Sequence, residues 1–147
     1  MNESPGPDVA RLLAALERLP RFRGLAFRGA PADVRYPHGA FVTSLLTATS
    51  RNPQVASENF AHGRLVAIAS RKGRDIGMLA ANPVEAEIVF LPGTTFLPLK
   101  EVRVVEADVT VLLVEEVDLA GGVPPDDRGL PTSLAEFESR VVEVVCA

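Results

Sequence analysis

The stretch that decides the fold is ANPVEAEIVFLPGT, which spans residues 81–94. It is an apolar run that ends at Pro92-Gly93 and carries two carboxylates two positions apart. Side chains two residues apart in a strand point to the same face of the sheet. We therefore expect a strand over residues 85–91 in which Glu85 and Glu87 share one face, while the other face is formed by Val84, Ala86, Ile88 and Phe90.

Two interpretations of this acidic pair are open. Adjacent carboxylates can work as a catalytic unit when mutual repulsion and the local environment separate their pKa values. Acidic side chains along one face of a strand are also typical of a surface that faces water. The segment alone does not distinguish an active site from a solvated strand face.

The composition of the chain excludes several classes of function. Its 147 residues are 47% hydrophobic and 23% charged, which is typical of a soluble globular protein with one core. The net charge of -4 argues against a nucleic-acid partner, because phosphate backbones are bound by basic surfaces. No apolar run approaches the ~18 residues that span a bilayer, and the N-terminus lacks the pattern of a signal peptide. We therefore expect neither a nucleic-acid partner nor a membrane partner.

Metal and disulfide chemistry are not expected either. Cys146 is the single cysteine, so it has no partner within the chain. His38 and His62 are isolated histidines, each followed by a glycine, and no His/Cys cluster has the spacing of metal ligands. We read both histidines as loop residues.

The pattern of apolar residues and breakers predicts the secondary structure. Residues 1–7 are rich in proline and glycine and predict a disordered tail before a single domain over residues 8–147. Helices are expected over residues 8–19, 53–60 and 133–145, although residues 141–145 also fit a strand. The first helix has an apolar stripe, which we expect to pack on the core. Strands are expected over residues 24–28, 41–47, 64–69, 75–79, 85–91, 95–105 and 108–117, with a basic turn over residues 70–74.

This order of elements favours one fold class. The helices fall mainly in the first half and the strands in the second, which favours an α+β fold with a mostly antiparallel sheet. The glycines form neither a dinucleotide-binding fingerprint nor a P-loop.

Two segments upstream carry further candidate site residues. In the first, Arg28 ends an apolar strand and Gly29 follows it. Arginine can bind a phosphate through two parallel hydrogen bonds, and glycine lets a ligand approach the backbone. In the second, a hydroxyl-rich strand end at residues 47–50 runs into a helix that carries Phe60. Hydroxyls orient a neighbouring carboxylate and an aromatic ring offers a stacking surface, but an ordinary strand end and a capped helix with Phe60 in the core fit as well.

Taken in order, the three segments resemble the motifs of the mono-ADP-ribosyltransferase family of the arginine-specific toxin type. That family shows an arginine at a first strand end, a Ser-Thr-Ser strand before a helix that carries a phenylalanine, and then Glu-x-Glu before an apolar strand. The resemblance runs from about Phe27 to Phe96, and residues 85–96 match the third motif best. It implies an ADP-ribosyltransferase-like fold whose mostly antiparallel β-sheets form a central cleft with flanking helices.

The resemblance also implies a role for individual residues. Arg28 would hold NAD through its phosphates, and the backbone of Gly29 would meet the nicotinamide amide. Phe60 would stack on or near the nicotinamide ring. Glu87 would be the catalytic carboxylate, which binds the nicotinamide ribose and stabilises the cation that develops as nicotinamide leaves. Glu85 would position or deprotonate the acceptor, a guanidinium in the expected case.

The hydroxyl-rich segment departs from the family pattern at one position. Aligned on Val55-Ala56 and Phe60, the Ser-Thr-Ser triplet falls on Ala48-Thr49-Ser50, so Ala48 stands where a serine normally holds the catalytic glutamate. Thr47 could replace that serine only after a register slip, which reverses the facing of the side chains. The expected NAD-binding hydroxyls are those of Thr47, Thr49 and Ser50, and a second phosphate contact is sought at Arg64 or Arg74.

The resemblance implies an enzyme that cleaves NAD and transfers ADP-ribose to a protein side chain, with arginine as the expected acceptor. The expected partners are NAD and an unidentified target protein, and an inhibitor or immunity protein is a further candidate. The protein is expected to be a bacterial toxin or effector, either cytoplasmic or delivered into a target cell by a secretion system. Three alternatives stay open: an NAD glycohydrolase with water as acceptor, a degenerate NAD-binding module, and a structural or interaction domain.

Overall fold

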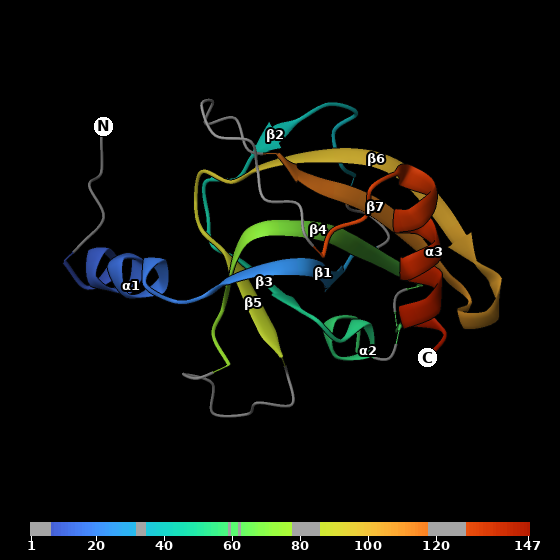
Figure 1. The fold of residues 1–147 in the computed structure, drawn as a ribbon, viewed down its shortest axis with the longest axis horizontal. Coiled ribbons are helices and arrows are strands. Elements are labelled where there is room, and N and C mark those ends of the chain that lie inside the picture. Colours follow the sequence, from blue (N-terminus) through green and yellow to red (C-terminus); the bar gives the residue numbers. More distant parts are fainter. Residues whose placement is uncertain (1–6, 32–34, 59, 62, 78–85, 118–128) are drawn as a thin grey trace.

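The computed structural model describes residues 7–31, 35–58, 60–61, 63–77, 86–117 and 129–147. Glu85, His62 and residues 1–6 of the expected tail lie outside these ranges. Within the described residues, none of the helices has the length and apolar character needed to cross a bilayer. The elements in chain order are α1 (Pro7–Glu17), β1 (Arg21–Gly29), β2 (Phe41–Val42), β3 (Thr47–Ser50), α2 (Pro53–Ala56), β4 (Arg64–Asp75), β5 (Glu87–Phe90), β6 (Thr95–Val104), the 3₁₀ turn η2 (Val105–Ala107), β7 (Val109–Val117) and α3 (Leu134–Val145) (Figure 1).

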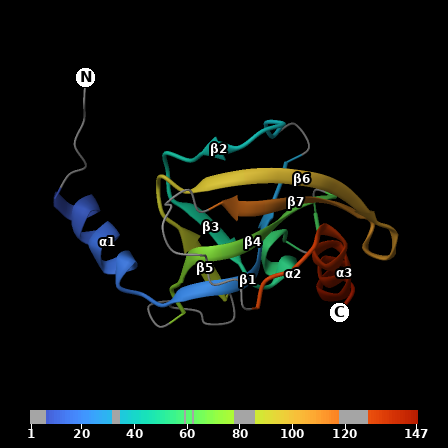
Figure 2. The same ribbon diagram turned by 45° about the horizontal axis from the view of Figure 1, so that its top comes forward.

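Seven strands form one sheet in the order β1-β3-β5-β4-β7-β6-β2. Neighbouring strands run antiparallel except β4 and β7, which are parallel. Strand β1 also pairs with β4, from Arg21 opposite Arg74 to Gly29 opposite Leu65, so β1, β3, β5 and β4 close into a ring. Figure 2 shows α3 beside the strands, with α2 close to it. The expected α+β class with a mostly antiparallel sheet is confirmed.

The core lies on both faces of the central strands. On β4, Leu65 and Ala67 face one buried cluster, whereas Val66 and Ile68 face another. The first cluster includes Phe137 and Val141 of α3, and the second includes aromatic side chains from several strands. The two clusters follow from the alternation of side chains along a strand that is covered on both sides.

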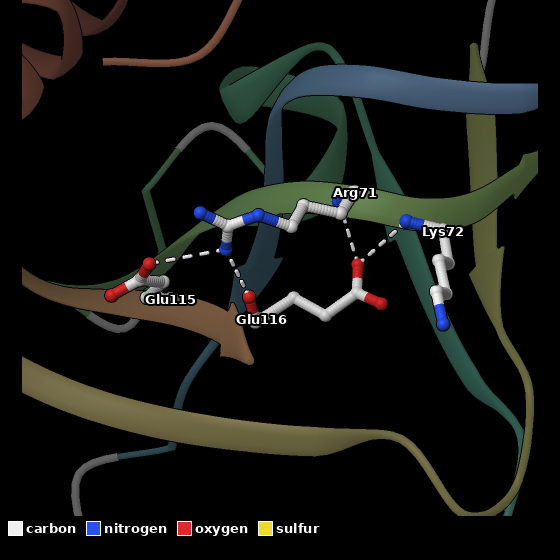
Figure 3. A network of polar contacts seen from close by, with 4 residues as sticks. All are labelled: Arg71, Lys72, Glu115 and Glu116. Atoms are coloured by element: carbon white, nitrogen blue, oxygen red, sulfur yellow. Dashed lines mark hydrogen bonds and ion pairs between the residues drawn. The ribbon is translucent and has the colours of Figure 1, made fainter. Parts of the chain in front are cut away.

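A buried carboxylate completes the pairing of β4 where it leaves β7. The parallel ladder between the two strands ends at Ala69 opposite Glu115. Beyond it, Oε1 of Glu116 accepts hydrogen bonds from the backbone N–H groups of Arg71, at 2.6 Å, and Lys72, at 2.8 Å (Figure 3). The Arg71 guanidinium in turn binds Glu115 at 3.0 Å and donates to the carbonyl oxygen of Glu116. The Glu116 side chain therefore satisfies N–H groups that the ladder no longer pairs.

This pairing corrects two predictions about strands. Residues 70–74 are part of β4, not a basic turn, because β1, β5 and the Glu116 carboxylate all bind the backbone there. The predicted strand over residues 41–47 is also wrong, since β2 and β3 are separate strands at distant places in the sheet. Strand β5 begins at Glu87, where a strand from Glu85 was expected.

The second helix is shorter than expected. It ends at Ala56, although the sequence predicted a helix to Phe60. The Ser57 hydroxyl donates to the carbonyl oxygen of Pro53 and accepts from the N–H of Phe60, and Glu58 and Phe60 both have left-handed backbones, with φ of 51° and 61°. Serine hydroxyls compete with helical hydrogen bonds in this way.

Helix α1 does not pack on the core as expected. Leu16 is buried, but Val9 and Leu12 are 49% and 48% exposed. Figures 1 and 2 both show α1 standing off from the sheet at one end of the molecule. The apolar stripe correctly predicted a helix, but not where that helix lies.

We predict that Glu116 makes the free energy of unfolding decrease as pH rises. Burial, which leaves this side chain 3% exposed, raises the pKa of Glu116 despite the two backbone hydrogen bonds. A raised folded-state pKa means that stability is highest below the ordinary glutamate pKa of about 4.3 and falls as pH rises through the folded value. Glu116→Gln keeps an acceptor oxygen, so its urea unfolding should lack this component of the pH dependence.

Glu116→Ala is the matched control for that variant. It leaves the two N–H groups without their acceptor and should cost about 1–3 kcal/mol at every pH. A wild-type stability that rose with pH in step with Glu116→Gln would contradict the assignment.

We also predict that Gly73 does not tolerate alanine. A Cβ at this position would lie 2.6 Å from Oγ of Ser70 and 2.7 Å from Cγ2 of Ile88. Overpacking of this kind costs about 1–3 kcal/mol, measurable by urea unfolding of Gly73→Ala. Gly39→Ala is the control, because a Cβ at exposed Gly39 meets nothing within 4 Å and should leave stability unchanged.

Candidate functional site

A hollow of about 270 Å³ lies where β1, β3 and β5 meet α2. The register of the sheet brings these strands together, because Ser50 on β3 pairs with both Phe27 on β1 and Glu87 on β5. The residues that line the hollow are Phe27, Arg28, Ala48, Thr49, Ser50, Val55, Ala56 and Glu87. The hollow therefore combines an arginine, two hydroxyls and a carboxylate from segments that are distant in the sequence.

Arg28 is held at the end of β1. Its Nη1 donates to the carbonyl oxygen of Ala48 at 3.1 Å, and its side chain is exposed. Gly29 follows, and a Cβ there would lie 3.0 Å from the carbonyl oxygen of Ala56. The contact with α2 gives a packing reason for glycine at this position, in addition to the expected approach of a ligand.

Three of the four residues of β3 are fixed in different ways. Thr49 is buried, and its hydroxyl donates to the carbonyl oxygen of Ile88 at 2.7 Å, which ties β3 to β5. The Ser50 hydroxyl accepts a hydrogen bond from the N–H of Asn52 at 3.0 Å. Ala48 pairs with Val89 and is exposed. Ala48 and Ser50 share a face, so Ser50 is the hydroxyl directly opposite Glu87.

Glu87 is the first residue of β5 and is partly buried. Its carbonyl oxygen accepts from the N–H of Ile76 at 3.2 Å. The preceding Ala86 has a left-handed backbone with φ of 47°, and its carbonyl oxygen accepts from the N–H of Arg51 at 3.0 Å. The extended alternation that predicted a common face for Glu85 and Glu87 therefore does not continue through Ala86.

Helix α2 forms one wall of the hollow. Its N-cap is Asn52, whose Oδ1 accepts from the N–H groups of Gln54 and Val55, and Pro53 occupies its first turn. Val55 and Ala56 then face the hollow together with Phe27. Nothing in the sequence marks these three as site residues. Their only signal was apolar character beside the motifs, which core residues share.

Some of the predicted site residues lie elsewhere. Phe60 packs against the core cluster that includes Phe137 and Val141, and it is not among the residues that line the hollow. Thr47 pairs with Phe90 and is also not a lining residue. Glu85 lies outside the described residues.

The two candidate second arginines differ in position. Arg64 is opposite Thr110 in the β4–β7 pair, and it donates to the carbonyl oxygen of Pro31 at 3.0 Å, just beyond the end of β1. Arg74 is opposite Arg21, roughly 20 Å from Arg28 along β1. Burial, followed by the charge of Arg21, lowers the pKa of Arg74. Of the two, Arg64 is at the same end of β1 as Arg28.

Other polar features lie outside this hollow. A second hollow, of about 270 Å³, is lined by Arg71, Glu115 and the start of α3. Its polar lining side chains belong to the ion-pair network and to the start of α3, so we assign the site to the hollow that contains Arg28 and Glu87. In the described part of the chain, no group of three or more His, Cys, Asp and Glu side chains could hold a metal ion.

The comparison of sequences finds one informative relative. The chain is 39% identical over 102 residues to Mav of Mycobacterium avium (strain 104), which is named as an NAD(+)–arginine ADP-ribosyltransferase. The match covers 65% of this chain and 12% of that protein, so the chain spans about an eighth of the relative's length. No protein-family profile matches the chain.

Solved structures share the fold. The Vis toxin, an ADP-ribosyltransferase from Vibrio splendidus, superposes with a TM-score of 0.59 at 25% identity, over 77% of this chain and 57% of that one. Vis has also been solved in complex with agmatine. Exoenzyme S of Pseudomonas aeruginosa, solved with a 14-3-3 protein and carba-NAD, has a TM-score of 0.58 at 20% identity, over 83% of this chain and 66% of that one. The sequence relative and the shared fold of the solved structures therefore confirm the resemblance to bacterial mono-ADP-ribosyltransferases.

Proposed function

We propose that this chain cleaves NAD and transfers ADP-ribose to an arginine of a protein. The observation that carries the proposal is that Arg28, Ser50 and Glu87, far apart in the sequence, line one hollow. The relative named as an arginine-specific ADP-ribosyltransferase supports both the reaction and the acceptor.

NAD is the substrate that fits the chemistry of these side chains. The exposed guanidinium of Arg28 binds a phosphate oxygen of the pyrophosphate, since arginine forms paired, charge-assisted hydrogen bonds with phosphate. The nicotinamide riboside half enters the hollow, whose apolar wall is formed by Phe27, Val55 and Ala56. Glu87 accepts a hydrogen bond from the ribose, with Ser50 beside it.

The reaction breaks the bond between C1′ of the ribose and the nicotinamide nitrogen. The bonding electrons leave with nicotinamide, and positive charge develops on the ribose. The Glu87 carboxylate stabilises this charge, and such preorganised stabilisation lowers the barrier only where charge develops. A guanidine nitrogen of the acceptor then bonds to C1′ and loses a proton to Glu85.

The relatives support a proposal for the acceptor and for the setting. Agmatine, which is bound in a Vis structure, is a small guanidine compound and serves as a simple model of an arginine side chain. We propose that the chain acts as a toxin or effector on a protein target inside another cell, where an inhibitor protein could oppose it. Water in place of the guanidine would give NAD hydrolysis at the same site.

Ala48 reduces the hydroxyl support of the catalytic carboxylate. On the face of β3 opposite Glu87 and Val89, Ser50 offers a hydroxyl and Ala48 offers only a methyl group. We propose that turnover is slower than it would be with hydroxyls at both positions.

Glu87→Gln should abolish nicotinamide release from NAD. The amide keeps the size and hydrogen bonding of the side chain but removes the charge that stabilises the developing cation, so we expect a loss of at least about 100-fold. Nicotinamide release is measured by chromatography, with Glu106→Gln, at an exposed position of η2, as the control. Equal rates of nicotinamide release by Glu87→Gln and wild type would contradict the proposed function.

Glu85→Ala should separate transfer from hydrolysis. Without Glu85 the acceptor nitrogen loses its base, so transfer of labelled ADP-ribose to agmatine should fall by about 100-fold while some nicotinamide release remains. Wild-type release of free ADP-ribose without any labelled acceptor would instead identify a glycohydrolase. Unchanged transfer by Glu85→Ala would show that the role assigned to Glu85 is wrong.

A further inference from the structure

Arg74 lies outside the hollow that contains Arg28, although its side chain is of the type that binds phosphate. It is opposite Arg21, the first residue of β1, whereas Arg28 is near the last. Figures 1 and 2 both show the start of β1 next to α1 and its other end towards α2. An anion bound by Arg74 would therefore occupy a second site, at the far end of the strand from the hollow.

Arg21 and Arg74 are like charges at facing positions. Directly opposite side chains of an antiparallel pair share a face, with Cβ atoms about 4.5–5.5 Å apart, and like charges there are destabilising. Burial, followed by the charge of Arg21, lowers the pKa of Arg74. The charges of Glu17 and Glu116 act in the opposite direction and offset this effect only in part. Since arginine stays protonated in proteins, the repulsion persists unless an anion joins the pair.

The fold supplies no such anion from the part of the chain that the structure describes. Within those residues, neither Arg21 nor Arg74 forms an ion pair with a carboxylate. Nε of Arg74 is buried, and none of the described residues accepts a hydrogen bond from it. Asp75 follows Arg74 along the strand and therefore faces the other side, where its Oδ1 accepts from the N–H of Gly77 at 2.9 Å.

Two hydrogen bonds fix the Arg74 side chain and the turn that precedes β1. Nη1 of Arg74 donates to the carbonyl oxygen of Leu19 at 3.1 Å, and the N–H of Asp75 donates to that of Pro20 at 3.1 Å. Arg18 belongs to the same turn, and Arg18 and Arg21 are both exposed. The turn thus holds positive charge in place before any ligand arrives, which lowers the entropic cost of binding.

We propose that Arg21 and Arg74 form a second anion site, with Arg18 adding to its positive charge, and that its ligand carries phosphate groups. Arginine binds phosphate through paired, charge-assisted hydrogen bonds, and two arginines on one face can share one phosphate group or bind neighbouring ones. A nucleic acid needs a longer basic surface, which the net charge of -4 argues against. The phosphate comes either from a soluble ligand or from a lipid headgroup. The site is independent of the proposed transfer reaction.

Binding of inorganic pyrophosphate, measured by isothermal titration calorimetry, tests the proposal. Arg28→Gln is the reference protein, because pyrophosphate would otherwise also bind at the hollow. Adding Arg21→Gln should weaken binding at least about tenfold, since a charge-assisted contact with phosphate is lost. Adding Arg103→Gln, which removes an exposed arginine of β6, should leave the affinity within about twofold. Equal affinities of the reference protein and the protein with Arg21→Gln would overturn the proposal.

Thermal unfolding gives a readout that a purely structural role of Arg21 would not produce. Without pyrophosphate, Arg21→Gln should not lower the melting temperature, because it removes the repulsion with Arg74. With pyrophosphate, the reference protein should become more stable and the protein with Arg21→Gln should not. A lower melting temperature of Arg21→Gln without pyrophosphate would contradict the proposal.

Vesicles of phosphatidylcholine and phosphatidylserine in equal parts separate the two sources of phosphate. Co-sedimentation that depends on phosphatidylserine and is lost in Arg21→Gln would support a lipid headgroup. Binding of pyrophosphate without co-sedimentation would support a soluble ligand, and the absence of both would overturn the proposal.

Nicotinamide release separates this site from the proposed function. Arg21→Gln should release nicotinamide from NAD at the wild-type rate, because Arg21 lies at the far end of β1 from the hollow. A loss of release in Arg21→Gln would assign the arginine to the NAD site and overturn the proposal of a second site. If wild-type protein released no nicotinamide, the proposed function would fail, while the calorimetric test of the second site would stand.

Discussion

The structure depends on the pairing of β4, a long strand that is buried on both faces. Strand β1 binds it along most of its length, β7 binds its first half, and β5 binds its end. A strand in this position must change partners without leaving polar backbone groups unpaired in a dry interior. The Glu116 carboxylate meets that requirement where β7 ends, and Gly73 lets Ser70 and Ile88 approach the backbone closely.

The candidate site follows from the same pairing. Since β4 binds both β1 and β5, the short strand β3 fits between those two and closes the ring. Ser50 then lies opposite Phe27 on one side and Glu87 on the other. The arginine at the end of β1 and the carboxylate at the start of β5 are thereby fixed by backbone hydrogen bonds, which hold side chains more rigidly than loops do. The hydroxyl of Thr49 adds a cross-strand bond at the same place.

The sequence predicted the parts of this arrangement that depend on local order along the chain. The fold class, the two strands that form β6 and β7, and a helix at the position of α3 were predicted. The errors occur where tertiary contacts override local preference. Residues 70–74 carry basic side chains and a glycine typical of a turn, yet three separate partners keep them extended. Phe60, which was expected at the nicotinamide, has a left-handed backbone beyond the end of α2 and packs against the core.

Helix α1 illustrates how unevenly stability is distributed in this molecule. It is 11 residues long, Leu16 is buried, and Val9 and Leu12 remain about half exposed. Helices shorter than about 12–15 residues are marginal in water unless packing supports them. The amide hydrogens of α1 should therefore exchange with solvent far faster than those of β4, through local fraying that leaves the rest of the fold intact. Any surface that covered Val9 and Leu12 would slow that exchange, so the protection of these amides would report directly on contact with it.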